Sequence, residues 1–495
     1  MPAQDAVGEA GATLSTDVAV IGAGAAGLWA ALVAAREGAQ VVLVSRSTLA
    51  ESASYWAQGG VAAALAADDS PERHARDSLT AGRGTARPSA IEVLCREAPE
   101  SVRELLAAGV RFDADRHGEL VLGLEGGHSA RRVVHAGGSA TGRRITRQLS
   151  ALAAEHPRIR VLEGTTAGAL WTDDGRCVGL TAEGPGGRTL VRARGTIVAT
   201  GGAAALWQRT TNPRGAIGAG LTLAHAAGAE LADLELVQFH PTALVAPNDY
   251  DGFLITEAIR GEGATLLDER GERFVDELAP RDEVALAIEA RLRADSPGTV
   301  RLDMRAVDLD RFPNVDSTLQ RAGFDARRAP VPVAPASHYT MGGIATDTHG
   351  RASVAGLYAV GECGGNGLHG ANRLASNSLA ECFVFGRRAA LAAASEPPPA
   401  AAAASQPPAT VSPVPPRPTR AALWRLAGLE RSAEGLRELA SDPFPLARAI
   451  AESALLRAES RGAHQRRDRP NLDPSLDGMH AVVPLGGRPR FERWE

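Results

Sequence analysis

The chain has 495 residues, of which 44% are hydrophobic, and a formal net charge of −5; this predicts a globular protein of two or three domains and excludes a globally basic, nucleic-acid-binding surface. Its four cysteines are scattered and it contains no lysine, so the sequence offers no metal-ligand spacing, no disulfide framework and no lysine for Schiff-base chemistry. The first residues lack a basic n-region and no apolar run is long enough to span a bilayer, so we expect a cytoplasmic protein with no membrane or nucleic-acid partner.

The first element pattern, TDVAVIGAGAAGLWAALVAAREGAQVVLVSRS, indicates a dinucleotide-binding βαβ unit. Residues 17–21 form an apolar strand, residues 22–27 spell GxGxxG before a helix, and residues 40–44 form the second strand. The glycines allow the backbone to approach a pyrophosphate at the amino terminus of the helix. Ser45 and Arg46 stand where an NAD site would place an acidic residue, which disfavours NAD.

Two later segments, GTIVATGG (195–202) and GLYAVGE (356–362), are short apolar runs that end in small residues. Such runs are typical of buried strands whose carboxyl ends face a ligand. A Pro/Ala-rich stretch then predicts a linker, and arginine-rich helical periodicity follows it. The predicted divisions are a nucleotide-binding domain in two parts, residues 1–228 and 335–390, an inserted capping domain, 229–334, a linker, 391–418, and a C-terminal helical domain, 419–495.

Six polar clusters stand in small or apolar surroundings, and each taken alone is more typical of hydrogen-bonded core residues than of functional ones. Together they offer arginine forks, histidines, a hydroxyl and carboxylates, and forks with histidines suit a small dicarboxylate in a dry pocket. No metal-ligand grouping accompanies them, so redox chemistry would need an organic acceptor such as a flavin. The clusters are EGGHSARRVVH (125–135), QFHPT (238–242), LITEAIRGEG (254–263), ELAPRD (277–282), HYTMGG (338–343) and HGANR (369–373).

The segments AQGG (57–60), QFHPT, TEAIRGEG, APRD, HYTMGG, GLYAVGE and HGANRLASNSL resemble, in order and spacing, the flavoprotein family of succinate dehydrogenase, fumarate reductase and L-aspartate oxidase. The resemblance covers roughly residues 15–390, with weaker similarity at LRAESRGAH in the tail. It implies an α/β fold with a Rossmann-like FAD-binding domain, an inserted α+β capping domain and a C-terminal helical domain.

Three details of the resemblance favour the aspartate-oxidising members. Ala53 stands where the dehydrogenases carry the histidine that binds flavin covalently, which implies noncovalent FAD. Glu125 and the RLASNSL stretch match the oxidases. The implied reaction converts L-aspartate to iminoaspartate and passes electrons to O2, giving H2O2, or to fumarate, giving succinate. Iminoaspartate is the family's feed into quinolinate and NAD synthesis, so quinolinate synthase is the implied functional partner.

The resemblance also assigns roles residue by residue. Arg281 matches the proton-transferring arginine, although a guanidinium pKa near or above ~12 allows a purely electrostatic role instead. The matching carboxylate-binding set is His240, Thr256, His338 and Arg373, and the acidic groups available to the ammonium are Glu125 and Glu257. The implied FAD-binding residues are Gly22, Gly24, Ala25, Ala26, Gly27, Arg46, Ser54, Gln58, Gly59, Gly60, Gly201, Glu362, Ser378 and Leu379. The chain departs from the pattern at Ala219, where the family's GDG has aspartate.

Three alternatives remain open from the sequence. A soluble fumarate reductase would use the same arginine clamp in the opposite direction, but the chain carries no haem attachment motif, iron–sulfur ligand set or covalent flavin site. A noncatalytic flavin-binding protein has only Ala219 in its favour. An NAD-dependent dehydrogenase is disfavoured by Ser45.

Overall fold

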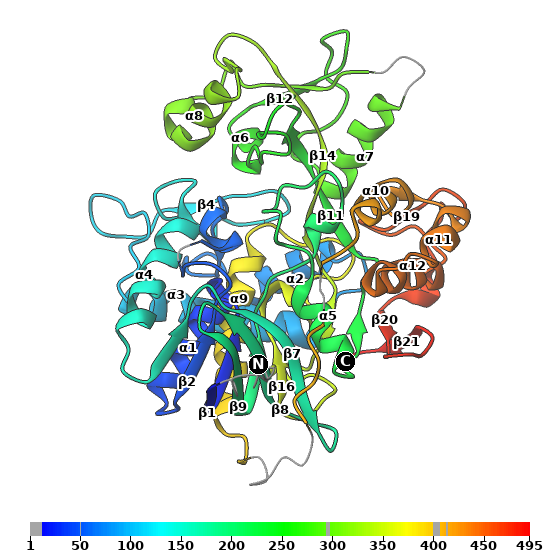
Figure 1. Ribbon diagram of the computed structural model, residues 1–495. Coiled ribbons are helices and arrows are strands. Elements are labelled where there is room, and N and C mark those ends of the chain that lie inside the picture. The colour runs from blue at the N-terminus through cyan, green and yellow to red at the C-terminus, as the bar shows by residue number, and fades with distance from the viewer. Residues whose placement is uncertain (1–11, 50, 294–297, 399–405, 412–413) are drawn as a thin grey trace, which may run out of the picture.

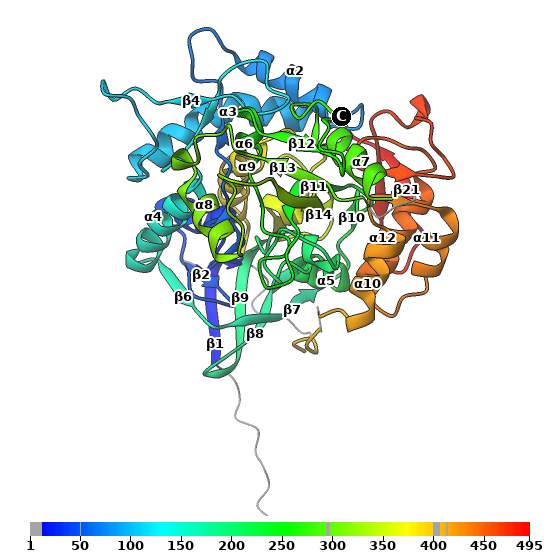
Figure 2. The same cartoon turned by 90° about the horizontal axis from the view of Figure 1, so that it is seen from above.

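The computed structural model describes residues 12–49, 51–293, 298–398, 406–411 and 414–495. Three parts are visible: a body built on a large sheet, a capping region above it, and a helical C-terminal part at the side (Figure 1). Viewed from above, strands of the capping region lie over the body, with the C-terminal helices beside them (Figure 2).

The body is organised by a seven-stranded sheet in the order β6-β2-β1-β9-β8-β7, with β16 also paired to β9. Strands β6, β2, β1, β9 and β16 are mutually parallel, whereas β7 and β8 form an antiparallel hairpin on β9. The strands are β1 (Ala12–Ile21), β2 (Val41–Val44), β6 (Ile159–Leu162), β7 (Thr166–Asp173), β8 (Arg176–Gly184), β9 (Gly187–Val198) and β16 (Leu357–Ala359). The prediction of buried strands at residues 17–21 and within 195–202 and 356–362 is confirmed, and the structure shows that they are parallel.

The helix after the glycine turn is also confirmed and is buried on nearly every side. Helix α1 packs against α9, where Trp29 meets Phe383 edge to face with ring centroids 6.0 Å apart. An all-round apolar helix is expected when a sheet lies on one side and other helices on the other. The helices of the body are α1 (Ala25–Arg36), α2 (Pro71–Ala81), α3 (Pro88–Ala107), α4 (Thr141–Glu155), α5 (Ala219–Ala226) and α9 (Asn377–Ala394). Three short strands, β3 (Val61–Ala62), β4 (Leu122–Gly123) and β5 (Val133–Val134), form a small separate sheet.

The capping region has its own antiparallel sheet and its own apolar core. The sheet order is β11-β14-β13-β12, and the core includes Leu266, Ile288 and Val315. Its two long strands, β11 and β14, run between the cap and the body (Figure 1). The elements are β11 (Val237–Leu244), α6 (Glu257–Gly261), β12 (Thr265–Leu267), α7 (Arg281–Leu292), β13 (Arg301–Asp303), α8 (Pro313–Arg321) and β14 (Val331–Thr340).

The C-terminal part is helical, as predicted, but its last residues also form strands that the periodicity did not predict. Strands β20 and β21 extend a sheet whose other members lie in the body, in the order β17-β15-β10-β20-β21. The elements are α10 (Arg417–Leu426), β18 (Glu430–Arg431), α11 (Ala433–Leu439), α12 (Pro445–Leu456), β19 (Gln465–Arg466), β20 (Met479–Val483) and β21 (Arg490–Arg493), with β10 (Leu231–Ala232), β15 (Gly343–Ala345) and β17 (Gly364–Gly365).

Both predicted ends of the linker differ from the structure, since α10 begins at Arg417, before the predicted linker end at residue 418. Helix α9 continues to Ala394, beyond the predicted start of the linker at residue 391. Part of the linker also contacts the hairpin of the large sheet: the Val411 N–H donates to the Gly168 carbonyl at 2.8 Å, and Thr410 donates to Glu183 at 2.7 Å. No helix in the described ranges is long and apolar enough to cross a membrane.

Candidate active site

The glycine turn between β1 and α1 has no room for side chains at two of its positions. Gly22 has φ +108°, and a Cβ there would lie 2.3 Å from the Ala199 carbonyl oxygen. A Cβ on Gly27 would lie 1.9 Å from the Gly22 carbonyl oxygen. The Ala25 N–H donates to Ser54 Oγ at 3.1 Å, so Ser54 already lies at the amino terminus of α1. The turn therefore presents free backbone donors and a positive helix end to an anion.

Other residues expected to bind FAD surround this turn. The Gly60 N–H donates to Ser376 Oγ at 3.1 Å, beside Ser378 and Leu379 in the first turn of α9. Gln58 Nε2 donates to the Leu254 carbonyl at 3.2 Å, while the buried Gln58 Oε1 has no partner among the described residues. Gly201 has φ +75°, and no described atom lies within 4 Å of a Cβ placed there. Free helix donors, an orphaned buried acceptor and this open space are together the features that fit a dinucleotide such as FAD.

Two further members of the expected FAD set lie at the edge of this region. The Glu362 carboxylate accepts the Thr340 N–H at 2.9 Å, and burial raises the pKa of Glu362 to about 7. Arg46 directly follows the buried Ser45 after β2 and reaches Gly215, where a Cβ would touch its guanidinium at 2.0 Å. Gly215 therefore has to be small for Arg46 to take this position.

Between the capping region and the body, one amide side chain joins two arginines. Gln238 Oε1 accepts a hydrogen bond from Arg281 at 3.0 Å and lies 3.3 Å and 3.4 Å from two Arg373 nitrogens. Gln238 is 1% exposed, and its Nε2 donates to Asn372 and to the Arg373 carbonyl. Since Gln238 is neutral, it brings the two guanidiniums together without cancelling their charge.

Arg373 has the unusual environment that its small neighbours in the sequence indicated. It is 5% exposed, donates to Ser378 Oγ at 2.7 Å and to His338 Nε2 at 3.2 Å, and lies over the Tyr339 ring at 4.4 Å. No carboxylate of the described chain lies within ion-pair distance of it. Burial, and next the charge of Arg281, lower the pKa of Arg373 to about 10. The site therefore has an unneutralised positive charge.

Two histidines stand beside these arginines. The His240 and His338 rings meet edge to face with centroids 5.1 Å apart. His338 Nδ1 lies 2.8 Å from Thr211 Oγ1, so Nδ1 carries the proton and Nε2 accepts from Arg373. Burial, together with the neighbouring arginines, holds the pKa of both histidines well below the usual value. Both are therefore neutral at pH 7.

The acidic residues occupy two different environments. Glu257 begins α6, directly after the buried Thr256, and its carboxylate lies 2.6 Å from Arg281 Nε and 3.7 Å from Arg260. Burial opposes ionisation of Glu257, but Arg281 and Arg260 outweigh it and lower its pKa. Glu257 thus already has two cationic partners. The expectation that it binds a substrate ammonium group did not foresee them.

Glu125 is held by neutral or weakly basic partners instead. Its carboxylate accepts from Ser376 Oγ at 2.6 Å and lies 3.2 Å from His135 Nε2. Burial opposes ionisation, but the hydrogen bonds and charge of His135, with Ser376, lower the pKa of Glu125 to about 2. The next residue, Gly126, lies against Glu257: a Cβ there would be 2.1 Å from Glu257 Oε1. The structure therefore brings Glu125 and Glu257 to the same region.

The expected substrate residues converge on one site, but sequence reasoning missed residues that organise it. Gln238 belongs to the quoted QFHPT stretch, so a signal was present, but its neutral side chain drew no assignment. Ser376 bridges Gly60 and Glu125 and has φ +59°, which a non-glycine residue seldom adopts. Thr211 and Asn212, which fix His338 by side-chain hydrogen bonds, lie in no motif.

A dinucleotide fold with a cap that closes arginines and histidines over it defines a flavin-dependent oxidoreductase acting on small acids. The FAD binding domain family matches residues 17–379, and the fumarate reductase flavoprotein C-terminal family matches residues 423–485. The chain belongs to the L-aspartate oxidase family. It is 46% identical over 481 residues to the L-aspartate oxidase of Agrobacterium fabrum, covering 92% of this chain and 91% of that one. The protein from Caulobacter vibrioides is 44% identical, covering 95% and 96%.

Solved structures agree in fold. A variant of E. coli quinol fumarate reductase FrdA superimposes with a TM-score of 0.87 at 27% identity, covering 98% of this chain and 97% of that one. The Mycobacterium smegmatis Sdh1 complex with UQ1 gives a TM-score of 0.83 at 30% identity, covering 98% and 95%. The predicted fold class, an α/β FAD-binding domain with capping and C-terminal parts, is confirmed.

Proposed function

We propose that this FAD-dependent oxidoreductase oxidises L-aspartate to iminoaspartate and passes the electrons to O2, giving H2O2, or to fumarate, giving succinate. The names of the relatives, at 44% to 46% identity over most of both chains, support this reaction. FAD, when bound, supplies the acceptor for the hydride that leaves the substrate Cα.

The observation that carries the proposal is the uncompensated charge of Arg373. A guanidinium that is 5% exposed, lies beside a second guanidinium and has no carboxylate of its own costs free energy in the ligand-free protein. A substrate carboxylate removes that cost and gains charge-assisted hydrogen bonds. The pocket therefore favours an anion, and a dicarboxylate has one group for Arg373 and a second for the neighbouring donors.

The remaining roles follow from the charges of the groups. We assign Arg373, His240, His338 and Thr256 to the two carboxylates. Arg373 and Thr256 are donors, His240 donates through Nε2 because its Nδ1 accepts from the Thr242 N–H, and His338 would donate once its Nε2 gives up the hydrogen bond from Arg373 and takes the proton. Glu125, ionised at neutral pH with no arginine partner in the described chain, suits the substrate ammonium better than Glu257, whose carboxylate holds Arg281. Arg281 stabilises charge without taking a proton, or serves as a relay that first passes a proton of its own to Glu257 or water and then takes the one that leaves the ammonium group.

We further propose that FAD is held noncovalently, because the Ala53 side chain has no atom able to form a bond to it. Iminoaspartate is an imine and hydrolyses in water, so an enzyme must consume it rapidly. Quinolinate synthase is the functional partner that this chemistry favours. The cytoplasmic location stays a prediction.

The test is an absorbance spectrum of the FAD-loaded protein before and after L-aspartate is added without oxygen. Loss of the flavin band with aspartate but not with succinate, and H2O2 on readmission of air, is the expected result. A band that aspartate leaves unchanged would overturn the proposal. Flavin that succinate reduces while aspartate does not would instead support the fumarate reductase alternative. Denaturation and filtration should release the flavin from the protein, whereas retained flavin would contradict noncovalent binding.

A variant of Arg373 tests the observation itself. Arg373→Met keeps the volume but removes the charge, so we expect kcat/KM for aspartate to fall about 100- to 1,000-fold. The same change removes an unpaired buried charge, so the ligand-free variant should unfold at or above the wild-type temperature. Arg373→Lys keeps the charge but not the forked guanidinium, so its kcat/KM should lie between those of the wild type and Arg373→Met. A marked loss of stability in Arg373→Met would show that the arginine is structural.

A further inference from the structure

Arg83 connects the body to the first turn of helix α7. It lies in the turn between α2 and α3, and its guanidinium holds Asp282 through two hydrogen bonds of 3.0 Å and 3.2 Å and Glu283 through one of 2.6 Å. The Asp282 side chain is 6% exposed and that of Arg83 29%, so the Asp282 pair is partly shielded from water. Glu283 is exposed and adds less.

The carboxylates that Arg83 holds adjoin Arg281. Helix α7 begins at Arg281, so Asp282 and Glu283 are the next two residues of its first turn. The Arg281 side chain reaches Glu257 at 2.6 Å and Gln238 at 3.0 Å. A rotation of the capping region that moves this turn away from the body breaks the Arg83 contacts and displaces the Arg281 backbone together with them.

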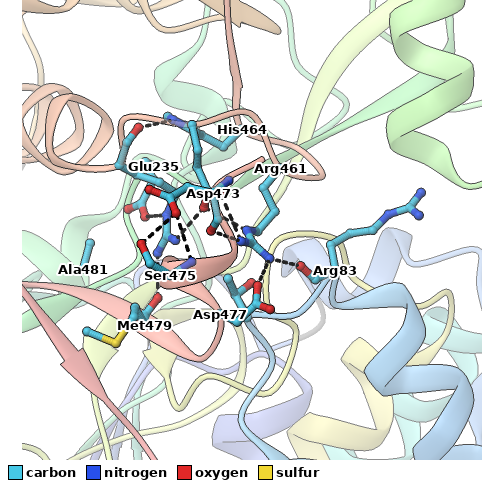
Figure 3. Close-up of polar contacts among 12 residues, drawn as sticks. Arg83, Glu235, Arg461, His464, Asp473, Ser475, Asp477, Met479 and Ala481 are labelled. Atoms are coloured by element: carbon cyan, nitrogen blue, oxygen red, sulfur yellow. Dashed lines mark hydrogen bonds and ion pairs between the residues drawn. The ribbon is translucent and has the colours of Figure 1, made fainter. Parts of the chain in front are cut away.

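The backbone of Arg83 is itself anchored from behind by the C-terminal part. Buried Arg461 donates to the Arg83 carbonyl at 2.7 Å, to Asp477 at 2.7 Å and to Glu459 at 2.8 Å and 3.0 Å. The Gly478 N–H donates to the Gly84 carbonyl at 2.8 Å. In Figure 3 the Arg83 main chain meets Arg461 while its side chain points away from that cluster. The backbone that carries the guanidinium is therefore held in place by the C-terminal part.

The backbone of Arg83 is held in a strained conformation. Its φ is +54°, in the left-handed region that non-glycine residues seldom occupy, although Gly82 and Gly84 flank it. A residue held in a strained conformation persists where surrounding contacts determine it, and such residues cluster at functional sites. Glycine or asparagine would adopt this φ more easily than arginine. The side-chain contacts to Asp282 and Glu283 are therefore the advantage that arginine has at this position.

We propose that Arg83 is a positioning residue for the reaction: it fastens the first turn of α7 to the body and so places Arg281 against Glu257 and Gln238. The proposal rests on the proposed function, because Arg281 is its target. The Arg83 side chain contacts neither the Arg373 cluster nor the glycine turn of α1 and reaches the site through α7, although the neighbouring Gly82 carbonyl accepts the Ala371 N–H at 3.1 Å.

The main test compares Arg83→Asn with the wild type. Asparagine tolerates the left-handed backbone and removes the guanidinium. We expect kcat/KM for aspartate to fall about 10- to 100-fold, as for a misplaced catalytic group, while FAD affinity stays unchanged. Arg83→Lys, which keeps the charge, should recover part of the loss. Amide exchange measured by mass spectrometry should be faster in the segment 281–293 of Arg83→Asn, with or without turnover.

Arg327→Asn is the matched control. Arg327 also joins two carboxylates, Asp310 at 2.7 Å and Asp316 at 3.0 Å, but all three residues lie within the capping region. It should leave kcat/KM and exchange in 281–293 unchanged. If Arg83→Asn does not fold, Asp282→Asn breaks the same pair from the other side and takes its place.

The outcomes separate the two proposals. Unchanged exchange in 281–293 together with kcat/KM within twofold of wild type overturns the role of Arg83. Wild-type flavin that aspartate does not reduce overturns the proposed function instead, and the exchange experiment then still decides whether Arg83 fastens α7. An equal loss of activity in Arg327→Asn would show that any lost ion pair has this effect and would also overturn the specific role.

Discussion

Gln238 explains how the buried Arg373 and the largely buried Arg281 share a site that still has positive charge for a substrate. Its Oε1 accepts from Arg281 and faces Arg373, and it is 1% exposed. A glutamate at this position has nearly the same shape but a full negative charge. We therefore predict that Gln238→Glu neutralises the two guanidiniums from within the protein and weakens the binding of a substrate carboxylate.

The magnitude follows from the geometry. The carboxylate introduced by Gln238→Glu would lie about as close to both guanidiniums as Oε1 does now, and thus roughly 5 Å from a substrate carboxylate bound to either one. At an effective dielectric constant of about 20, two like charges roughly 5 Å apart repel by about 3 kcal/mol, which is roughly a hundredfold in affinity. Stability should change little, because the new ion pairs offset the lost hydrogen bonds from Nε2 to Asn372 and the Arg373 carbonyl.

The assay is anaerobic reduction of the flavin at a series of aspartate concentrations, with the midpoint of urea unfolding measured on the same preparations. The apparent Kd should rise about 100-fold in Gln238→Glu with the unfolding midpoint near that of wild type. Gln148→Glu is the control: Gln148, in α4, donates to the Ala108 carbonyl and lies far along the chain from the arginines, so its change should leave the Kd unaltered. Wild-type affinity in a folded Gln238→Glu variant would refute the requirement for a neutral acceptor.

Two further changes test the nucleotide-binding part. Burial raises the pKa of Glu362 to about 7. Between the pKa of the unfolded chain and pH 7 the native state therefore binds an extra proton, and the wild-type protein loses stability as pH rises through that interval. In urea unfolding of the FAD-free protein, the free energy of unfolding of Glu362→Gln should equal that of wild type at pH 4.5 and exceed it by up to about 3 kcal/mol at pH 8. Equal pH dependence of the two proteins would contradict the raised pKa. Gly27→Ala places a Cβ 1.9 Å from the Gly22 carbonyl oxygen, so the turn must move. We expect about 1–3 kcal/mol of destabilisation and weaker FAD binding in a flavin fluorescence titration. Wild-type FAD affinity in this variant would show that the turn is not part of the nucleotide site.

The sequence predicted the parts of the fold that local patterns determine. The βαβ unit depends on strand and helix periodicity and on glycines whose Cβ atoms would collide with the backbone, and all of these are local properties. Strands β20 and β21 were missed because they are short: β20 gains its order by pairing with β10, which lies more than 240 residues earlier in the chain, and β21 pairs in turn with β20. The ends of the linker were misplaced because helices α9 and α10 extend a few residues into the Pro/Ala-rich stretch. Within that stretch, Val411 donates to the distant Gly168 carbonyl, a contact that the local sequence does not indicate.

The site was predicted as a set of residues but not as a set of pairs. Arg281, Glu257 and Glu125 were each identified, yet composition cannot show which carboxylate neutralises which arginine. The structure pairs Glu257 with Arg281 and leaves Glu125 to Ser376 and His135. This pairing favours Glu125 over Glu257 as the ammonium partner, and it comes from the fold of each part: Glu257 and Arg281 both lie in the cap, whereas Glu125 and its partners all lie in the body.

Buried arginines of this chain show why pairing decides between a structural and a functional role. Arg457 is fully buried, yet the carboxylates of Glu235 and Asp233 outweigh burial and raise its pKa, so it stabilises the C-terminal part. Arg431 is buried with no carboxylate of the described residues at ion-pair distance, and burial lowers its pKa to about 10; its Nε and Nη1 meet the Gly428 and Glu235 carbonyls and His464, while its Nη2 has no partner there. Arg373 has the same lowered pKa, but a second guanidinium stands beside it and a neutral amide lies between them. Burial alone therefore does not identify the anion site; an unneutralised guanidinium that shares one neutral acceptor with a second guanidinium does.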